Sequence, residues 1–227
     1  MPSVASRLLD IATASAGLLV GAPVMVAVAL AIKLDSPGPV FFTQTRVGRG
    51  HKPIRVVKFR TMRPQAERLG PAITATADPR ITRIGEILRK TKLDELPQLW
   101  NVLRGEMAIV GPRPEVPRYV DHYRPAWKRL VDERPGLTDL GSIVFRDEER
   151  LLAEARDRER AYMEIVMPMK LALALQGLEA KSLRNDLAVI ARTAAAIVRG
   201  HDPASATFVE EARRQIEQLN RSTMEDS

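Results

Sequence analysis

One uninterrupted apolar run near the N-terminus dominates the hydrophobic pattern of the chain. Residues 11–32 carry no charge. As a helix this run is about 33 Å long, which is enough to cross a bilayer core of roughly 30 Å. The simplest prediction is therefore a single transmembrane helix. A cleaved signal peptide is a weaker alternative, because the run is longer than the apolar core of such a peptide.

Two features of the run favour a helix that enters and leaves the membrane by the same leaflet. Pro23 lies at its middle, where a proline removes a backbone hydrogen bond and bends the helix. Cationic flanks prefer the cytoplasmic face, and basic residues flank both ends of this run. These are Arg7 on one side and Lys33, Arg46, Arg49 and Lys52 on the other. The pattern leaves the bent helix and the straight span open.

The rest of the chain alternates between strand and helix patterns. Alternating apolar positions predict two strands at 40–47 and 54–61, joined by a hairpin loop. Apolar positions three and four apart predict helices at 81–90, 96–103, 118–133, 148–177, 183–199 and 207–220. Residues 65–78 are polar and predict a surface loop.

These elements predict a helix-rich, mixed α/β fold with a small β-hairpin or sheet. We expect an N-terminal membrane helix at 1–35, a main domain at 36–202 and a C-terminal tail at 203–227. The helix at 183–199 is strongly amphipathic, so it is expected to lie on the membrane surface.

The composition limits the ligands and the kinds of site that the chain can have. The net charge is +7, from 35 Lys and Arg against 28 Asp and Glu, which predicts attraction to phosphorylated substrates, anionic lipid or nucleic acid. The chain has no cysteine, which excludes disulfides, thiolate metal sites and a cysteine nucleophile. The three histidines, His51, His122 and His201, are too scattered to predict a zinc site.

The adjacent carboxylates of Asp94 and Glu95 are the first candidates for chemistry. Pro97 cannot lie deep inside a helix, so the pair is placed at the amino-terminal end of a helix. Exposed N–H groups and the helix dipole favour anionic groups there. By itself, such a pair is more often a helix cap than a catalyst.

Basic residues around the pair change that interpretation. Arg89, Lys90 and Lys92 precede it, and the segment Gly-Pro-Arg-Pro-Glu at 111–115 follows a short apolar strand. A rigid turn can aim the guanidinium of Arg113 at two phosphate oxygens, although an exposed turn arginine is the simpler alternative. Two neighbouring carboxylates could then divide the work: one attacks a phosphorus atom and the other holds a divalent cation.

Five segments of the chain together resemble the bacterial sugar transferases, the monotopic phosphoglycosyl transferases. They recur in the same order as in that family and cover most of residues 8–200. The segments are KLDSPGPVFFTQTRVG (33–48), VKFRTM (57–62), LDELPQLWNVLRGEM (93–107), VGPRPE (110–115) and RPGLT (134–138).

The resemblance implies a reaction. A nucleotide sugar, usually a UDP-sugar, gives its sugar 1-phosphate to polyprenyl (undecaprenyl) phosphate and releases UMP, which begins the synthesis of a polysaccharide, lipopolysaccharide or glycoprotein glycan. Asp94 would be the nucleophile that forms an aspartyl-phosphosugar intermediate, and Glu95 would be a ligand of Mg²⁺. The residues expected to bind phosphate are Arg89, Arg113 and Arg146, with Lys58 and Arg60 as weaker candidates.

The resemblance also implies a location and partners. The family's N-terminal helix is re-entrant and is broken near a Ser-Pro pair. Here the pair is Ala22-Pro23, which keeps the proline but lacks the hydroxyl. The catalytic domain is expected on the cytoplasmic face of the bacterial inner membrane. Membrane lipids and a second copy of the chain, as a homodimer, are expected partners, and nucleic acid is not.

One segment departs from the family pattern. After residues 134–138 many members continue Gly-Trp-Ala-Gln-Val-Asn-Gly, whereas this chain reads DLGSIVFR at 139–146. Two other functions stay open from the residues. An inverting glycosyltransferase would release UDP, but the Asp-x-Asp motif common in such enzymes does not occur. A basic membrane-surface module would need no chemistry from Asp94 and Glu95.

Overall fold

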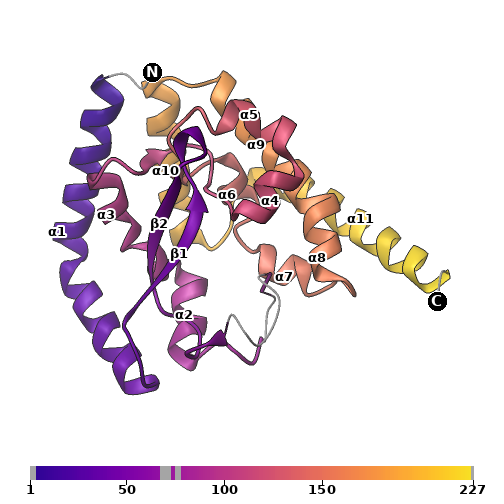
Figure 1. Cartoon of the computed structure of the whole chain (residues 1–227), viewed down its shortest axis with the longest axis horizontal. Coiled ribbons are helices and arrows are strands. Elements are labelled where there is room, and N and C mark those ends of the chain that lie inside the picture. The colour runs from indigo at the N-terminus through magenta and orange to yellow at the C-terminus, as the bar shows by residue number, and fades with distance from the viewer. Residues whose placement is uncertain (1–3, 67–72, 75–77, 226–227) are drawn as a thin grey trace.

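The computed structural model describes residues 4–66, 73–74 and 78–225. It confirms a helix-rich, mixed α/β fold with small sheets and a long apolar N-terminal helix (Figure 1). Most of the surface loop expected at 65–78 lies outside the described residues.

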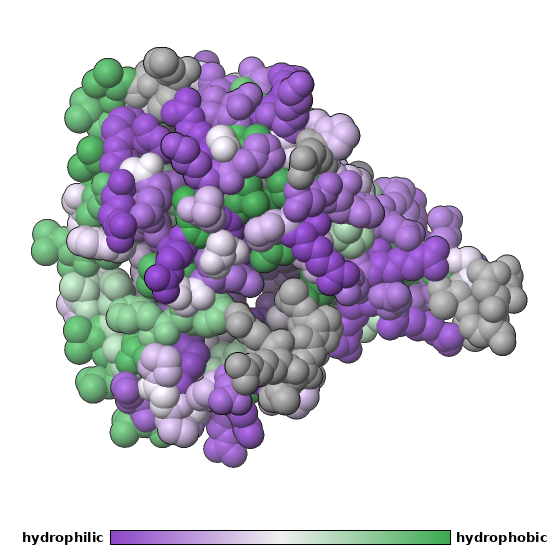
Figure 2. Space-filling view, in the orientation of Figure 1, coloured by the Kyte–Doolittle hydropathy of each residue, from purple (hydrophilic) through white to green (hydrophobic). Residues whose placement is uncertain are grey.

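Helix α1 (Val4–Asp35) runs along one side of the molecule and continues through Pro23 (Figure 1). Within the described ranges it is the one helix long and apolar enough to cross a membrane. Its inner face buries Ala14, Val28 and Ile32. Figure 2 shows hydrophobic residues along the edge that α1 occupies. Large apolar side chains exposed on α1 include Leu8, Leu19, Val20, Val26, Leu30 and Leu34.

Both ends of α1 are bonded to the same globular domain. Near the start of the helix, the carboxylate of Asp10 accepts a hydrogen bond from the backbone N–H of Ile109 at 2.8 Å. At its end, the carboxylate of Asp35 accepts one from the backbone N–H of Ile84 at 3.2 Å. The helix therefore lies against the domain along its length.

The predicted hairpin is present as β1 (Phe41–Val47) and β2 (Pro53–Phe59), which pair antiparallel with Phe41 opposite Phe59. A second sheet joins β3 (Ala108–Val110) to β4 (Gly136–Thr138) in parallel. The backbone segments at Gly111 and Gly136 approach each other very closely. A Cβ atom on Gly136 would lie 2.2 Å from the backbone nitrogen of Gly111. Glycine is therefore required where these segments meet.

Helices form most of the remaining structure. Two continuous helices expected from the pattern, 118–133 and 148–177, are wrong: each is divided. Pro125 begins a new helix because a proline is accommodated best in a first turn. Asp157 accepts a hydrogen bond from the backbone N–H of Arg160 at 2.9 Å and so caps another new start. The helical elements after β2 are α2 (Arg83–Thr91), η3 (Leu93–Glu95), α3 (Gln98–Leu103), α4 (Pro117–His122), α5 (Arg124–Leu130), α6 (Leu140–Val144), α7 (Glu148–Leu152), α8 (Arg158–Ala161), η4 (Tyr162–Val166), α9 (Met167–Glu179), α10 (Leu183–Arg199), η5 (Pro203–Ser205) and α11 (Ala206–Glu225).

Three apolar clusters hold these elements together. The largest is built mainly from α4 to α9, and Ala212 and Ile216 of α11 are fully buried in it. A second joins α1 to β2, α3 and β3, with Leu99 near its centre. A third packs Ile32 of α1 against Phe59 and α2. The last two clusters fix α1 beside the elements that carry Asp94 and Glu95.

Candidate active site

Asp94 and Glu95 lie in η3, in the tight connection between α2 and α3. Helix α2 ends where Lys92 adopts a left-handed conformation, with φ 60° and ψ 15°. Pro97 then caps α3. The pair therefore precedes a helix, as the position of the proline predicted. The two carboxylates have different surroundings.

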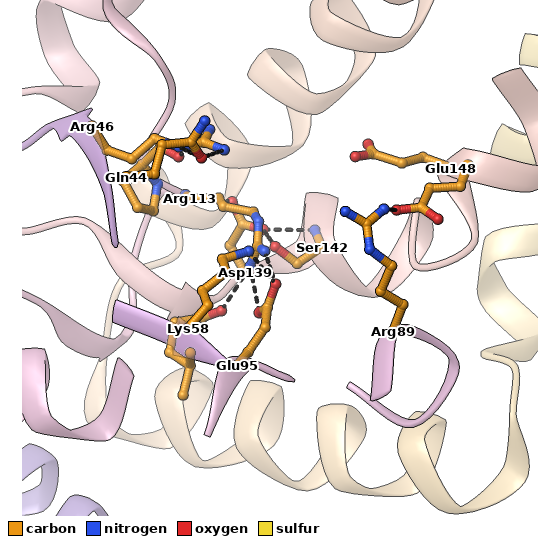
Figure 3. Close-up of polar contacts among 12 residues, drawn as sticks. Gln44, Arg46, Lys58, Arg89, Glu95, Arg113, Asp139, Ser142 and Glu148 are labelled. Carbon is orange, nitrogen blue, oxygen red and sulfur yellow. Dashed lines mark hydrogen bonds and ion pairs between the residues drawn. The ribbon is translucent and has the colours of Figure 1, made fainter. Parts of the chain in front are cut away.

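Glu95 is clamped between two cations (Figure 3). Lys58 of β2 donates to its Oε1 at 3.0 Å. Arg113 donates through Nη1 to Oε2 at 3.1 Å and through Nη2 to Oε1. Burial alone would raise the pKa of Glu95, but Arg113 and Lys58 outweigh it and hold that pKa well below its usual range. Glu95 is therefore ionised at neutral pH.

Asp94 is only 7% exposed, and its Oδ1 atom has no hydrogen-bond partner among the described residues. Burial, followed by the adjacent charge of Glu95, raises the pKa of Asp94 to about 6, although Lys58, Lys92 and Arg89 act in the opposite direction. An unpaired buried oxygen is costly and is typical of a functional group. Near pH 7 this carboxylate is mostly ionised and is not stabilised by a donor at Oδ1.

The loop that carries Arg113 is fixed from both sides. The backbone N–H of Arg113 donates to Asp139 Oδ2 at 3.2 Å, and its Nη1 donates to the carbonyl of Leu137 at 3.2 Å. The other oxygen of Asp139 caps α6 by accepting from the backbone N–H of Ser142 at 2.7 Å. Arg113 is thus held over Glu95 by Leu137 and by Asp139, the first residue of the segment that departs from the family pattern.

A buried ion pair anchors the far end of the same loop. Glu115 accepts from Arg46 Nη1 at 2.5 Å and from the hydroxyl of Tyr162 at 2.8 Å. Gln44 in turn accepts from Arg46 Nε at 2.9 Å. Sequence reasoning did not select these residues for the site. Gln44, Arg46 and Glu115 do lie within the segments that carry the family resemblance, and this was the one signal available.

Arg89 and Arg146 have different partners near the end of α2. Arg89 Nε donates to Thr61 Oγ1 at 3.0 Å, and its Nη1 donates to Glu149 at 2.6 Å. Arg146 donates to the carbonyl of Lys90 at 3.0 Å and to that of Ala196 on α10. Arg89 therefore lies within electrostatic reach of Asp94, whereas Arg146 links α2 to α10.

The two weaker candidates on β2 differ in position. Lys58 is part of the clamp on Glu95. Arg60 is buried and donates to the carbonyls of Pro37 and Ser36 at 2.7 and 2.8 Å, so it secures the turn that follows α1. The structure brings Lys58 to the carboxylates and directs Arg60 elsewhere.

Glu148 is another residue that sequence reasoning missed. It projects from α7 toward the side of the site where Arg113 lies (Figure 3). Lys170 of α9 donates to its Oε2 at 2.8 Å. Its charge contributes to raising the pKa of the Arg113 guanidinium, after Glu95. Glu148 thus adds a negative group opposite the cationic clamp.

The carboxylates of the site could also bind a metal ion. In the part of the chain that the structure describes, no three carboxylate or imidazole side chains are grouped closely enough to enclose a metal. Magnesium, however, is usually bound by one or two carboxylates together with substrate phosphates and water. The ionised carboxylate of Glu95 fits this requirement.

The chain is similar to a known protein family and to several individual proteins. The family model described as "Bacterial sugar transferase" matches residues 1–200. The UDP-glucose:undecaprenyl-phosphate glucose-1-phosphate transferase of Caulobacter vibrioides is 38% identical over 190 residues, covering 82% of this chain and 67% of that protein. An exopolysaccharide production protein of Rhizobium leguminosarum is 48% identical over 150 residues, covering 63% of this chain and 75% of that protein.

Longer relatives match through one part of their length. The UDP-glucose:undecaprenyl-phosphate glucose-1-phosphate transferase of Escherichia coli is 49% identical over 137 residues, which cover 59% of this chain and 30% of that protein. With the family model matching residues 1–200 of 227, the chain belongs to the bacterial sugar transferase family.

Proposed function

We propose that this protein transfers a sugar 1-phosphate from a UDP-sugar to undecaprenyl phosphate through a phosphosugar bound to Asp94. The observation that carries the proposal is the buried, unpaired Asp94 oxygen beside a Glu95 clamped by Arg113 and Lys58. Family membership and the names of the relatives support the overall reaction, which initiates polysaccharide synthesis.

In the first step the Asp94 carboxylate attacks the phosphorus that carries the sugar. A bond forms from its oxygen to that phosphorus, and the bond from the phosphorus to the bridging oxygen breaks. UMP leaves with the bridging oxygen and its electron pair. The positive charge of Arg113, held beside Glu95, can stabilise the phosphate oxygens on which charge accumulates. Asp94 needs no base, since it is already ionised near neutral pH.

In the second step an oxygen of undecaprenyl phosphate attacks the same phosphorus. The bond to Asp94 breaks, the carboxylate is regenerated, and the product is an undecaprenyl diphosphate sugar. The two steps share one protein carboxylate and one phosphate site. A single buried carboxylate can therefore serve both substrates in turn.

Glu95 would hold a Mg²⁺ ion. Such an ion, when bound, neutralises charge on the diphosphate of the donor. Lys58 and Arg113 keep Glu95 ionised in the meantime, so that it is ready to bind a cation. A homodimer remains a prediction.

The lipid substrate and the apolar α1 indicate membrane association. We further propose that α1 is re-entrant and that the domain lies on the cytoplasmic face. The contacts of Asp10 with Ile109 and of Asp35 with Ile84 support this, because both ends of α1 touch one domain. A straight span would separate its ends by the whole bilayer.

Cysteine labelling tests the course of α1. The chain has no native cysteine, so Ala5→Cys and Pro39→Cys introduce single thiols at exposed positions on either side of the apolar run. In sealed inside-out vesicles, an impermeant maleimide should label both thiols from the cytoplasmic face. If only one of the two were labelled from that side, α1 would cross the membrane.

The nucleotide product tests the reaction. With UDP-sugar and undecaprenyl phosphate the protein should release UMP, and Asp94→Asn should reduce this release at least about a thousandfold because the nucleophile is lost. Asp132→Asn, at an exposed position, is the matched control and should retain activity. Release of UDP would instead identify an inverting glycosyltransferase.

A further inference from the structure

An apolar groove of about 270 Å³ lies between α9 and α10. Its walls are formed mainly by small or aliphatic side chains. We call it the α9–α10 groove, and its principal lining residues are Pro112, Leu140, Ala174, Gly177, Leu178 and Val189. The mechanism above gives it no role.

The charged residues at the groove already have protein partners or carry the wrong sign for a nucleotide. Arg192 is paired with Asp202 at 2.7 Å, and Lys181 is paired with Glu133. Asp186, which also lines the groove, is a buried acid. A diphosphate would be repelled by Asp186 and would find neither cation free. A neutral hydrocarbon chain suits these walls.

The groove lies beside a helix with an exposed apolar face. On α10, Leu183 is 43% exposed, Leu187 49% and Val198 87%. Ile190, three residues after Leu187 and on the same side of α10, packs against the cluster that contains Ala14 of α1. This apolar side suits a position of α10 at the membrane surface, and the opposite side of the helix forms one wall of the groove.

The groove borders the loop that carries Arg113. Gly111 and Pro112 line it and are followed directly by Arg113, which donates to Glu95. Asp139 also lines the groove and accepts from the backbone N–H of Arg113. A hydrocarbon chain bound in the groove would therefore lie next to the loop that carries the guanidinium of Arg113.

We propose that the α9–α10 groove binds the first isoprenoid units of the polyprenyl phosphate acceptor and directs its phosphate toward Arg113. This inference rests on the proposed function and names the place of its lipid substrate. An apolar cavity of roughly 150 Å³ accommodates a six-carbon ring such as benzene. By that measure the groove has room for about two five-carbon units.

The test separates the two halves of the reaction. Gly177→Leu adds bulk inside the groove, and its Cβ would meet only Leu140 Cδ1, at 4.0 Å. It should raise KM for undecaprenyl phosphate about tenfold or more, because contact with an isoprene unit is lost. UMP release measured without acceptor should be unchanged. Gly177→Ala should give a smaller effect of the same kind.

Ala172→Leu is the matched control, since it adds comparable bulk on the exposed side of α9. It should leave both measurements unchanged. Two results with Gly177→Leu would overturn the proposal: an unchanged KM for the lipid, or a raised KM for the UDP-sugar with normal lipid kinetics. Failure of the wild-type protein to release UMP would contradict the proposed function and not the groove.

A second measurement needs no variant. Wild-type protein in vesicles is irradiated with a prenyl phosphate that carries a diazirine on its second isoprene unit, and the labelled peptides are mapped. Labelling of residues 174–192 that unlabelled undecaprenyl phosphate suppresses would support the proposal. Labelling confined to α1 or to the rest of the domain would reject it, whether or not transfer is observed.

Discussion

At the scale of single residues, two adjacent carboxylates are given opposite tendencies by their neighbours. Glu95 faces Arg113 and Lys58 and is held ionised. Asp94 is buried, and burial with the charge of Glu95 raises its pKa to about 6. This separation fits the roles proposed for the pair, in which Glu95 is the permanent anion that would hold a cation and Asp94 is the poorly solvated nucleophile.

The pH dependence of UMP release tests the state of Asp94. Release without acceptor should increase with pH through a midpoint near 6, because only the ionised form of Asp94 attacks. Lys58 lowers the pKa of Asp94, so Lys58→Met should move this midpoint to higher pH. Lys52→Met, on the exposed hairpin loop, should not move it. The same midpoint in Lys58→Met and wild type would refute the assignment.

The ion pair of Glu115 with Arg46 should contribute to the stability of the fold. Glu115→Gln should destabilise the fold by roughly 3–5 kcal/mol, because the charge of Arg46 loses its buried partner. The pKa of Glu115 is lowered in the fold, chiefly by Arg46 against the effect of burial. Its contribution to stability is therefore present above its usual pKa and is lost as the pH falls toward the folded value.

Thermal unfolding in detergent at several pH values measures this contribution. The difference between wild type and Glu115→Gln should be largest near neutral pH and should shrink in acid. A difference that does not depend on pH would show that the carboxylate charge is not responsible.

At the scale of elements, the local sequence pattern predicted several helices and strands but not how they pack together. The apolar run, the hairpin and the helix at 183–199 follow from periodicity and turn residues, and they are present. The parallel pairing of β3 with β4 could not be predicted, since each strand is three residues long and carries almost no pattern. The divided helices were missed because their apolar spacing continues across Pro125 and Asp157.

The close approach at Gly136 offers a test of this second sheet. Gly136→Ala should force β3 and β4 apart, because the new Cβ would lie 2.2 Å from the nitrogen of Gly111. The expected cost is roughly 1–3 kcal/mol of stability, with a loss of activity as the loop carrying Arg113 shifts. Gly21→Ala is the control, since nothing lies within 4 Å of its Cβ. Full activity of Gly136→Ala would show that the loop does not depend on this contact.

At the scale of the whole molecule, residues distant in sequence form the site. Lys58 from the hairpin, Arg113 from the loop after β3 and Glu149 from α7 were brought together with the α2–α3 connection only by the tertiary fold. The family resemblance pointed to Asp94, Glu95 and Arg113 because they lie in recognisable motifs. It could not indicate Glu148, which lies beyond those motifs, or the α9–α10 groove, most of whose lining residues also lie beyond them.

Membrane attachment is a property of the whole exposed face of α1. Leu19→Arg combined with Val20→Arg places two charges where the side chains are nearly four-fifths exposed. Each charge should weaken insertion by about 2.5 kcal/mol or less, depending on depth. Vesicle flotation should therefore show less bound protein. Phe208→Arg on α11 is the control, and equal loss from that variant would argue against α1 as the anchor.

The most direct test of the central claim is the mass of the intact protein after mixing with a UDP-sugar in the absence of acceptor. The mass should increase by one sugar phosphate, which peptide mapping should locate on Asp94. The increase should be absent in Asp94→Asn and should be lost when undecaprenyl phosphate is added. Transfer to the lipid without any such adduct in wild type, or with an adduct on another residue, would contradict the central claim.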